Sequence, residues 1–229
     1  MARLAKLTIE EIRDEVLSLI AFDQPDLNII ELSDDKVEIS GRLFVMPKSP
    51  ENQPLGALDQ FEVRIVIPIG FPAIEPLVFE TGGRIERELD YHVKPNGSCC
   101  YSVWPAWLAD AKDQSISEVV SGPIMDFFRW QYVRLNGIDA ATAIGERQHY
   151  ISGLLDAYAE VLDCSPTQKS VSSHLKVLRR KWLRSRWRCP CGSRKKIGVC
   201  CETNLRKIKG RVSPEIAEIM QEKLNSQSR

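Results

Sequence analysis

The stretch from His92 to Trp107, HVKPNGSCCYSVWPAW, places a glycine-led turn directly before two adjacent cysteines. Asn96 and Gly97 both tolerate positive φ, so a tight turn is predicted at this point. A chain that leaves a strand through such a turn presents side chains to solvent, as a nucleophilic thiol requires. Cys99 and Cys100 could equally be small buried hydrophobic residues, and the local sequence leaves both interpretations open.

The residues before this stretch predict one helix followed by antiparallel strands. Thr8 and Glu11 have the spacing of a capping box, and apolar residues then recur at helical intervals until Pro25. Prolines at 68, 72 and 76 exclude helix from the next connection and predict a rigid, extended crossover. The sequence therefore predicts a helix over 8–23 and strands over 36–46, 61–67 and 77–79.

The residues after the stretch predict two further helices. Ser115 begins an apolar pattern of helical period that ends at Asn136, and Pro123 should kink it. A second pattern of this kind runs over 146–162. Together with the strand meander, these helices predict an α+β fold.

Charge is distributed unevenly, although the whole chain carries no formal net charge. Residues 1–164 have 14 basic and 27 acidic side chains, whereas residues 165–211 have 15 basic and one acidic. A domain boundary is therefore predicted near Asp163–Pro166. The predicted segments are a main domain over 1–164, a basic linker or helix over 165–188, a cysteine motif over 189–211, and a short helix with a tail over 212–229.

The apolar and cysteine patterns favour a cytoplasmic protein. No apolar run approaches the ~20 residues of a membrane span, so no membrane association is expected. The first residues, MARLAKLTIEEIRDE, are acidic where a signal peptide would be apolar. Six of the seven cysteines lie in tight pairs, which favours metal binding or thiol chemistry over a disulfide framework.

The pattern Cys189-Pro-Cys191, eight residues, then Cys200-Cys201 has the spacing of a metal site. Four thiolates brought together by a turn at Gly192-Ser193 form a closed tetrahedral site for Zn²⁺, which is structural rather than catalytic because no position stays open. The pattern resembles the SEC-C motif found at the C-terminus of SecA and on many bacterial proteins. The alternative is unligated thiols or disulfides.

The first ~160 residues resemble the ubiquitin-conjugating enzyme family in the order of their elements. Phe71-Pro72 and Glu75-Pro76 resemble the family's proline crossover. His92 followed by Gly97-Ser98-Cys99-Cys100 resembles its His…Gly-x-x-Cys segment, with Trp104 or Trp107 downstream. The likeness is closest to bacterial members found in CBASS antiphage operons beside a cGAS-like nucleotidyltransferase, and GERQHYISGLLDAY (145–158) resembles a helix pattern of those proteins.

This resemblance implies thioester chemistry at Cys100 with the C-terminus of a partner protein, in particular that nucleotidyltransferase. It implies an activating enzyme acting in trans, or a simpler system with fewer components that works without one. A catalytically silent adaptor with the same fold is the alternative.

His92 and Asn96 are the other residues expected at this site. His92 is placed to orient or deprotonate the thiol, or else makes a structural hydrogen bond. Asn96 departs from the family's His-Pro-Asn triplet and is expected mainly to supply the turn, with backbone N–H groups around Cys100 left to stabilise an oxyanion. Asp110 and Asp113 are further candidates to orient an incoming amine.

Residues 171–188 are predicted to form a basic helix in which tryptophans alternate with Lys and Arg. This composition permits nucleic-acid binding. Packing on the acidic part of the chain, or on an acidic partner, is the interpretation we favour from sequence.

Overall fold

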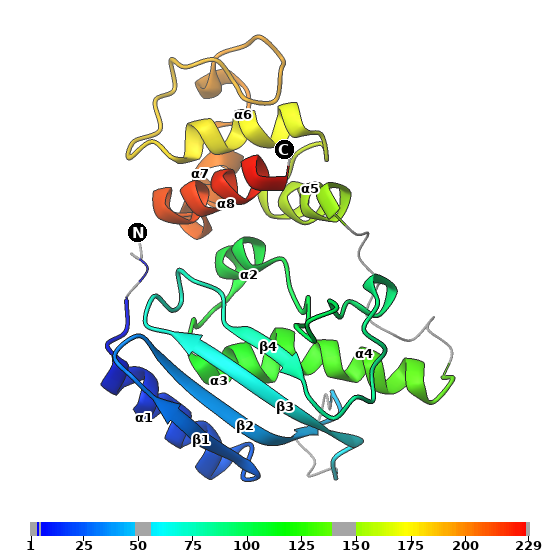
Figure 1. Ribbon diagram of the computed structural model, residues 1–229. Coiled ribbons are helices and arrows are strands. Elements are labelled where there is room, and N and C mark those ends of the chain that lie inside the picture. The colour runs from blue at the N-terminus through cyan, green and yellow to red at the C-terminus, as the bar shows by residue number, and fades with distance from the viewer. Residues whose placement is uncertain (1–3, 5, 49–55, 139–149, 228–229) are drawn as a thin grey trace. The chain divides into compact units, whose positions relative to one another are not determined.

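The structure is a computed structural model of the 229-residue chain that describes residues 4, 6–48, 56–138 and 150–227. The chain divides into two compact units (Figure 1). The sheet unit comprises 6–102 and 113–146, and the C-terminal unit comprises 103–112 and 147–229 together with 1–5. Each unit is described by itself.

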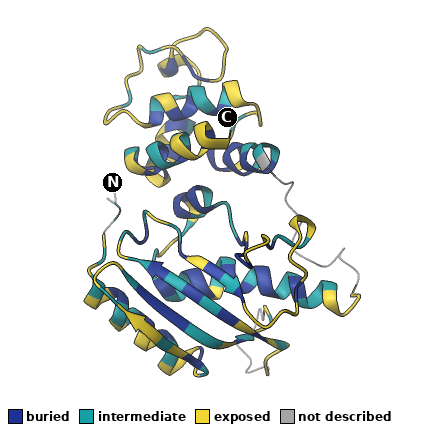
Figure 2. Ribbon diagram, in the orientation of Figure 1, coloured by how far each residue is buried: buried dark blue, intermediate teal, exposed yellow. Residues whose placement is uncertain are grey.

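The sheet unit is built on one four-stranded antiparallel sheet in the order β1-β2-β3-β4. Its strands are β1 (Leu27–Leu32), β2 (Lys36–Val45), β3 (Asp59–Pro68) and β4 (Leu77–Glu80). Apolar residues at alternate positions of β2 and β3 are buried, so one face of the sheet is apolar (Figure 2). The unit is thus α+β with the predicted meander, although β1 was not predicted.

Helices of the sheet unit cover this apolar face. In α1 (Ile9–Phe22), the predicted capping box forms between Thr8 and Glu11 and fixes the start of the helix. A second helical stretch runs through α3 (Ile116–Val119), a π-helical turn η2 (Val120–Ile124) and α4 (Met125–Leu135). The predicted kink at Pro123 is confirmed by the non-helical backbone of Gly122. Phe128 of α4 packs on Phe61 of β3, with ring centroids 5.0 Å apart.

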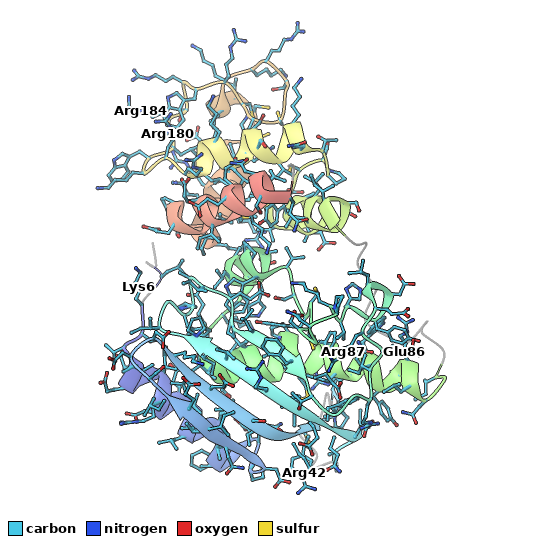
Figure 3. The ribbon with its side chains drawn as sticks, in the orientation of Figure 1. Lys6, Arg42, Glu86, Arg87, Arg180 and Arg184 are labelled. Carbon is cyan, nitrogen blue, oxygen red and sulfur yellow. The ribbon has the colours of Figure 1, made fainter. Side chains whose placement is uncertain are left out.

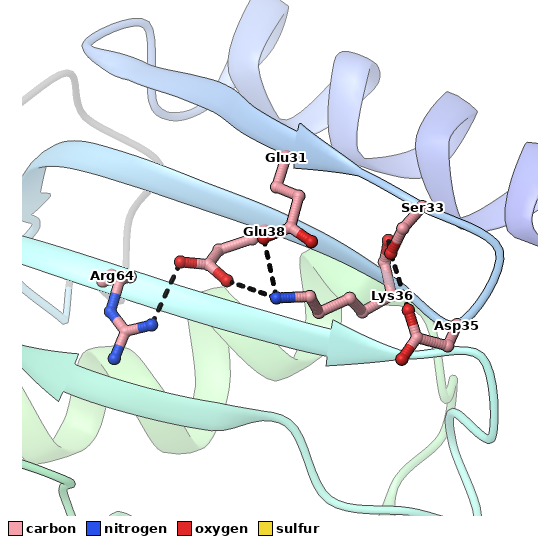
Figure 4. Close-up of polar contacts among 6 residues, drawn as sticks. All are labelled: Glu31, Ser33, Asp35, Lys36, Glu38 and Arg64. Atoms are coloured by element: carbon pink, nitrogen blue, oxygen red, sulfur yellow. Dashed lines mark hydrogen bonds and ion pairs between the residues drawn. The ribbon is translucent and has the colours of Figure 1, made fainter.

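The other face of the sheet carries a charged network (Figure 4). Lys36 Nζ contacts Glu31 at 2.7 Å and Glu38 at 3.0 Å, and Arg64 donates to the second Glu38 oxygen at 3.0 Å. The hydrogen bond from Lys36 is the main reason that the pKa of Glu38 lies below its ordinary value. A buried carboxylate on this face is therefore satisfied by two cations.

The connection from β3 to β4 is not the extended crossover that the prolines predict. It turns on itself, because Phe71 N–H donates to the Pro68 carbonyl and Ile74 N–H to the Gly70 carbonyl, both at 2.9 Å. Prolines exclude a regular helix here, but they leave these N–H groups free to form turns. Phe71, within this connection, is fully buried.

The C-terminal unit is mainly helical. Its helices are α2 (Trp104–Asp110), α5 (Tyr150–Leu162), α6 (Gln168–Leu178), α7 (Glu202–Arg211) and α8 (Pro214–Gln227). Helices α2, α5, α6 and α8 contact one another through apolar faces. Arg211 joins the end of α7 to this group, because its guanidinium contacts Asp110 Oδ1 and the Val161 carbonyl, each at 2.8 Å.

These units do not coincide with a division at residue 164. The apolar residues of α5 pack against α6 and α8, and α2 packs with them, so both helices belong to the C-terminal unit. Charge marks where basic residues begin, whereas apolar packing decides the boundary of a compact unit. Residues 139–149, which include the start of the predicted 146–162 helix and of the 145–158 pattern, lie outside the described residues.

The predicted basic helix over 171–188 is wrong beyond Leu178, where α6 ends. Lys209 Nζ donates to the carbonyls of Leu178 and Arg180, which satisfies acceptors at the end of the helix. Trp187 then returns toward the cysteine motif, because Ile197 N–H donates to its carbonyl at 2.8 Å. No helix in the described parts of the chain has the length and apolar character to cross a membrane.

Candidate functional site

The turn before Cys100 is closed by backbone hydrogen bonds beside the last strand of the sheet. Gly97, at φ 84°, donates its N–H to the Lys94 carbonyl at 2.8 Å, and Lys94 N–H donates to the Ser98 carbonyl at 2.9 Å. Cys99 N–H donates to the Val78 carbonyl of β4 at 2.7 Å. The segment thus adds a short extension to the sheet, and its alternating side chains face opposite ways.

This alternation separates the two cysteines. Cys99 is 8% exposed and faces the core, whereas Cys100 is exposed. Burial raises the pKa of the Cys99 thiol to about 12, which keeps it protonated and unreactive at neutral pH. Of the two interpretations left open by the sequence, the buried one holds for Cys99 and the exposed one for Cys100.

His92 is held next to Cys100 through its backbone. It ends the short 3₁₀ helix η1 (Leu89–Tyr91) in a left-handed conformation at φ 54°. The His92 carbonyl accepts the Cys100 N–H at 2.7 Å. Its ring stands edge-on to Trp130 of α4, with ring centroids 5.6 Å apart. The structure therefore brings His92 to the cysteine turn and gives both its carbonyl and its ring structural contacts there.

Helix α4 anchors the η1 loop through residues that sequence reasoning missed. Gln131 is fully buried and donates its Nε2–H to the Tyr91 carbonyl at 2.7 Å. The Arg134 guanidinium lies 4.0 Å from the ring centroid of Tyr91 and 4.8 Å from that of Trp130. Gln131 could have been predicted to make such a contact. It lies four residues after Phe127 on the apolar face of the helix, and a polar residue at a core position needs a buried hydrogen-bond partner.

Asn96 shapes the turn. Its Oδ1 accepts hydrogen bonds from Ser98 N–H at 3.0 Å and Ser98 Oγ at 2.8 Å, the pattern of an Asx turn. The N–H groups of Ser98, Cys99 and Cys100 already donate to Asn96, Val78 and His92 respectively. The expectation that N–H groups around Cys100 stabilise an oxyanion does not hold for these three, since each is used to hold the turn.

The two further acidic candidates have structural contacts of their own. Asp113 Oδ1 accepts the Ser115 N–H at 3.1 Å, just before α3. Asp110 pairs with Arg211 inside the C-terminal unit. Both carboxylates therefore contribute to local structure.

The second candidate site is a cysteine cluster in the C-terminal unit. The Sγ atoms of Cys189, Cys191, Cys200 and Cys201 all lie within 4.8 Å of one another. The Cys191–Cys200 and Cys200–Cys201 sulfur distances are 3.5 and 3.6 Å. A tetrahedral site with metal–sulfur bonds near 2.3 Å needs sulfur–sulfur distances of about 3.8 Å. The four predicted ligands are thus brought together at a spacing that could hold a metal ion.

The loop around the cluster is ordered by its own backbone. Cys189 N–H donates to the Lys195 carbonyl at 2.9 Å, and Gly192 at φ 83° turns the chain between the first two cysteines and Lys195. Cys189 packs with Ile197 and Leu205 in a small apolar core, with Leu183 and Trp187 against it. This core is small, so a bound metal would supply much of the stability of the segment.

No family model matches the chain, and no curated protein or solved structure matches it.

The chemistry of the two sites therefore follows from their residues. Hydrogen bonding from Ser193 lowers the pKa of Cys191, which favours the thiolate that a metal requires. Burial raises the pKa of Cys189, so deprotonation of that ligand would depend on the metal. Cys100, by contrast, is an exposed thiol outside this group of sulfurs.

Proposed function

We propose that the protein transfers acyl groups in the manner of ubiquitin-conjugating enzymes, with Cys100 carrying the C-terminus of a partner protein as a thioester. One observation carries this proposal above all others. A Gly97 turn on the edge of a helix-flanked meander exposes Cys100, while the neighbouring Cys99 is buried. An acyl group on Cys100 would meet little steric hindrance from the sheet.

The surroundings of the turn support a rigid thiol platform. Tyr101, immediately after Cys100, is buried and donates its hydroxyl to the Pro76 carbonyl at 2.9 Å. The residue after Cys100 is thereby bonded to the proline connection. The N–H of Cys100 itself is bonded to His92, in the loop that α4 anchors. Transfer between exposed thiols needs access and correct positioning more than a strong base, because the thiolate is already a good nucleophile.

The proposed reaction has two balanced steps. The Cys100 thiolate attacks the carbonyl carbon of the partner's activated C-terminal acyl group and a new C–S bond forms. The bond to the former carrier breaks, and that carrier leaves as a thiolate or as a nucleoside monophosphate. An amine then attacks the Cys100 thioester, the C–S bond breaks, and the amine proton passes to solvent as Cys100 is released. Neither step changes an oxidation state.

The resemblance to bacterial conjugating proteins suggests the partners. The acyl donor would be the C-terminus of a cGAS-like nucleotidyltransferase in antiphage defence, and an activating enzyme in trans would supply the activated acyl group. The cysteine cluster would be a SEC-C-like site in which Cys189, Cys191, Cys200 and Cys201 hold one structural Zn²⁺. Bound zinc would fold the segment and leave no open position for catalysis.

The test is intact-mass spectrometry of the protein co-expressed with its genomic neighbours, measured with and without thiol reductant. A thioester predicts an adduct that reductant removes. Cys100→Ser should convert the adduct into an ester that survives reductant, and Cys100→Ala should abolish it. Cys164→Ala is the matched control, because Cys164 lies outside both candidate sites and its loss should leave the adduct unchanged.

Two results would contradict the proposal. If the adduct survives Cys100→Ala and disappears with Cys99→Ala, the assignment within the pair is wrong. If no cysteine carries an adduct although a neighbour co-purifies with the protein, the chain is a silent adaptor that binds its partner without reacting.

A further inference from the structure

The loop around the cysteine cluster carries a dense, exposed cationic surface that the proposed acyl transfer does not use. The sequence has no acidic residue between Ser165 and Cys201. We call the following exposed side chains the cationic loop surface: Arg180, Lys181, Arg184, Arg186, Arg188, Arg194, Lys195 and Lys196. Arg180 and Arg184, labelled in Figure 3, both follow the end of α6 at Leu178.

These cations differ from other basic residues of the region in their ion pairing. Other basic residues of the region do have partners, since Arg179 pairs with Glu218, Arg206 with Glu202 and Arg211 with Asp110. Among the described residues of the C-terminal unit, no carboxylate pairs with any member of the cationic loop surface. The surface therefore has spare positive charge for a ligand.

The backbone holds these charges together despite their repulsion. Arg188 and Lys196 face each other across an antiparallel bridge, and Gly198 N–H donates to the Ser185 carbonyl at 2.9 Å. Like charges directly opposite on paired strands destabilise the pairing. A polyanion would remove this repulsion, and the loop would lose little entropy on binding because its backbone is already ordered.

An exposed indole lies within the same surface. Trp182 is 66% exposed, and Lys181 Nζ lies 5.5 Å from its ring centroid. Trp187, five residues later, packs instead against the small apolar core of the cluster. An indole left in solvent beside clustered cations offers a flat face for stacking, which nucleobases provide and acidic protein side chains do not.

We propose that the cationic loop surface binds single-stranded nucleic acid, with phosphates contacting the Arg and Lys side chains and one base stacking on Trp182. A single strand is favoured over a duplex because base faces are exposed only in unpaired strands. This inference is independent of the Cys100 chemistry and holds whether or not the chain forms a thioester.

Fluorescence anisotropy of the full zinc-loaded protein with a labelled oligothymidylate tests the proposal. If about four phosphates are contacted, affinity should fall about 50-fold between about 50 and about 200 mM salt. Trp182→Ala should weaken binding about 5- to 150-fold, the range for loss of one stacked base, while Trp182→Phe should retain most of it. Phe22→Ala is the matched control, because Phe22 is an 84% exposed aromatic residue of the sheet unit.

A charge-reversal pair separates the loop from general basicity. Arg184→Glu should lower affinity and reduce the steepness of the salt dependence, whereas Lys6→Glu, an exposed lysine of the sheet unit, should change neither (Figure 3). Circular dichroism and zinc content of each variant confirm that the fold is intact.

Three outcomes would overturn the proposal. If the protein binds duplex and single strand with equal affinity, and Trp182→Ala does not change that affinity, only non-specific charge attraction is left. Polyglutamate competing as well as an oligonucleotide of equal charge would assign the surface to an acidic protein. No binding at low salt, together with a lower melting temperature for Arg184→Glu, would mean that the cations are engaged by carboxylates of the chain itself.

Discussion

The sheet unit and the C-terminal unit each contain a pair of adjacent cysteines, and the two pairs differ in what surrounds them. In the sheet unit, strand-like alternation buries Cys99 and exposes Cys100. In the C-terminal unit, Cys200 and Cys201 come at the start of α7, and their sulfurs lie 3.6 Å apart beside Cys189 and Cys191. Backbone conformation therefore decides whether neighbouring thiols separate or converge, and hence which chemistry is open to them.

Removal of one sulfur from the converging group should have the largest effect. Cys200→Ser replaces an exposed cysteine of the proposed zinc site without disturbing the small apolar core, so it separates loss of metal from loss of packing. Structural zinc sites supply on the order of 10 kcal/mol of binding free energy. We expect zinc content to fall from one ion per chain to none after mild chelation, and residues 185–211 to become protease-sensitive.

The control for this prediction is Cys164→Ser, which should keep its zinc. Retention of one tightly bound ion by both Cys200→Ser and Cys189→Ser would show that the cluster is not the metal site.

Alkylation kinetics should separate the two cysteines of the sheet unit. With a pKa near 12, Cys99 is ionised in about one molecule in 10⁴ at pH 8, and it is also shielded from reagent. Peptide mapping after iodoacetamide treatment should show Cys100 labelled at least about 100-fold faster than Cys99. If zinc occupies the cluster as proposed, its cysteines should be labelled only after the metal has been removed. Equal rates at Cys99 and Cys100 in the folded protein would refute the separation.

The positive-φ glycines of the two sites should respond alike to an added methyl group. Gly97 and Gly192 have φ of 84° and 83°, and neither would bring an added Cβ closer than 3.6 Å to another atom. Gly97→Ala and Gly192→Ala should each cost about 1–2 kcal/mol from backbone conformation alone. For Gly97→Ala, chemical denaturation measures the lower free energy of unfolding. For Gly192→Ala, a zinc-binding titration should show a roughly tenfold loss of zinc affinity.

Gly210→Ala supplies a control of opposite sign. Gly210 lies in α7 with space around it, and alanine in a helix is favoured by about 0.5–1 kcal/mol. A stabilising effect at all three positions would contradict the proposed role of positive φ.

The last expected effect is an alkaline loss of stability at Cys99. Burial raises its folded-state pKa to about 12, so its contribution is fully present below the unfolded pKa near 9 and is lost as pH rises toward 12. The free energy of unfolding should therefore fall by up to about 1.4 kcal/mol per pH unit more steeply in the wild type than in Cys99→Ala above pH 9. Urea titrations of the wild type and Cys99→Ala at pH 8 and pH 10 test this. If the free energy of unfolding changes equally with pH in both proteins, Cys99 does not titrate on unfolding.

Local chemistry made much of the fold predictable. The Thr8 capping box, the Pro123 kink and the alternation in β2 and β3 depend on near neighbours and were predicted from sequence. Strand β1 was not predicted, because a register shift between Ile29 and Glu31 breaks the alternation that identifies a half-buried strand. Its existence depends on pairing with β2, which local sequence does not encode.

The candidate sites were predictable to different depths. The spacing of the four cluster cysteines along the chain identified them, and the structure brings their sulfurs within 4.8 Å of one another. Which cysteine of the 99/100 pair is exposed depends on Cys99 pairing with Val78, a contact distant in sequence. The Gln131–Tyr91 anchor and the end of α6 at Leu178, which Lys209 completes, are likewise tertiary contacts that periodicity does not reveal.

The segment that presents Cys100 also closes an edge of the sheet. Ser98 bridges to Phe79, Cys99 N–H donates to the Val78 carbonyl, and Glu80 N–H donates to the Gly97 carbonyl. These contacts cover N–H and C=O groups of β4 that would otherwise be open to a strand from another molecule. At the opposite edge, the bulge in β1 interrupts the row that such a strand would need. Damage that detaches the cysteine turn would therefore expose the unpaired edge of β4. The protein would then self-associate into β-rich aggregates through this edge.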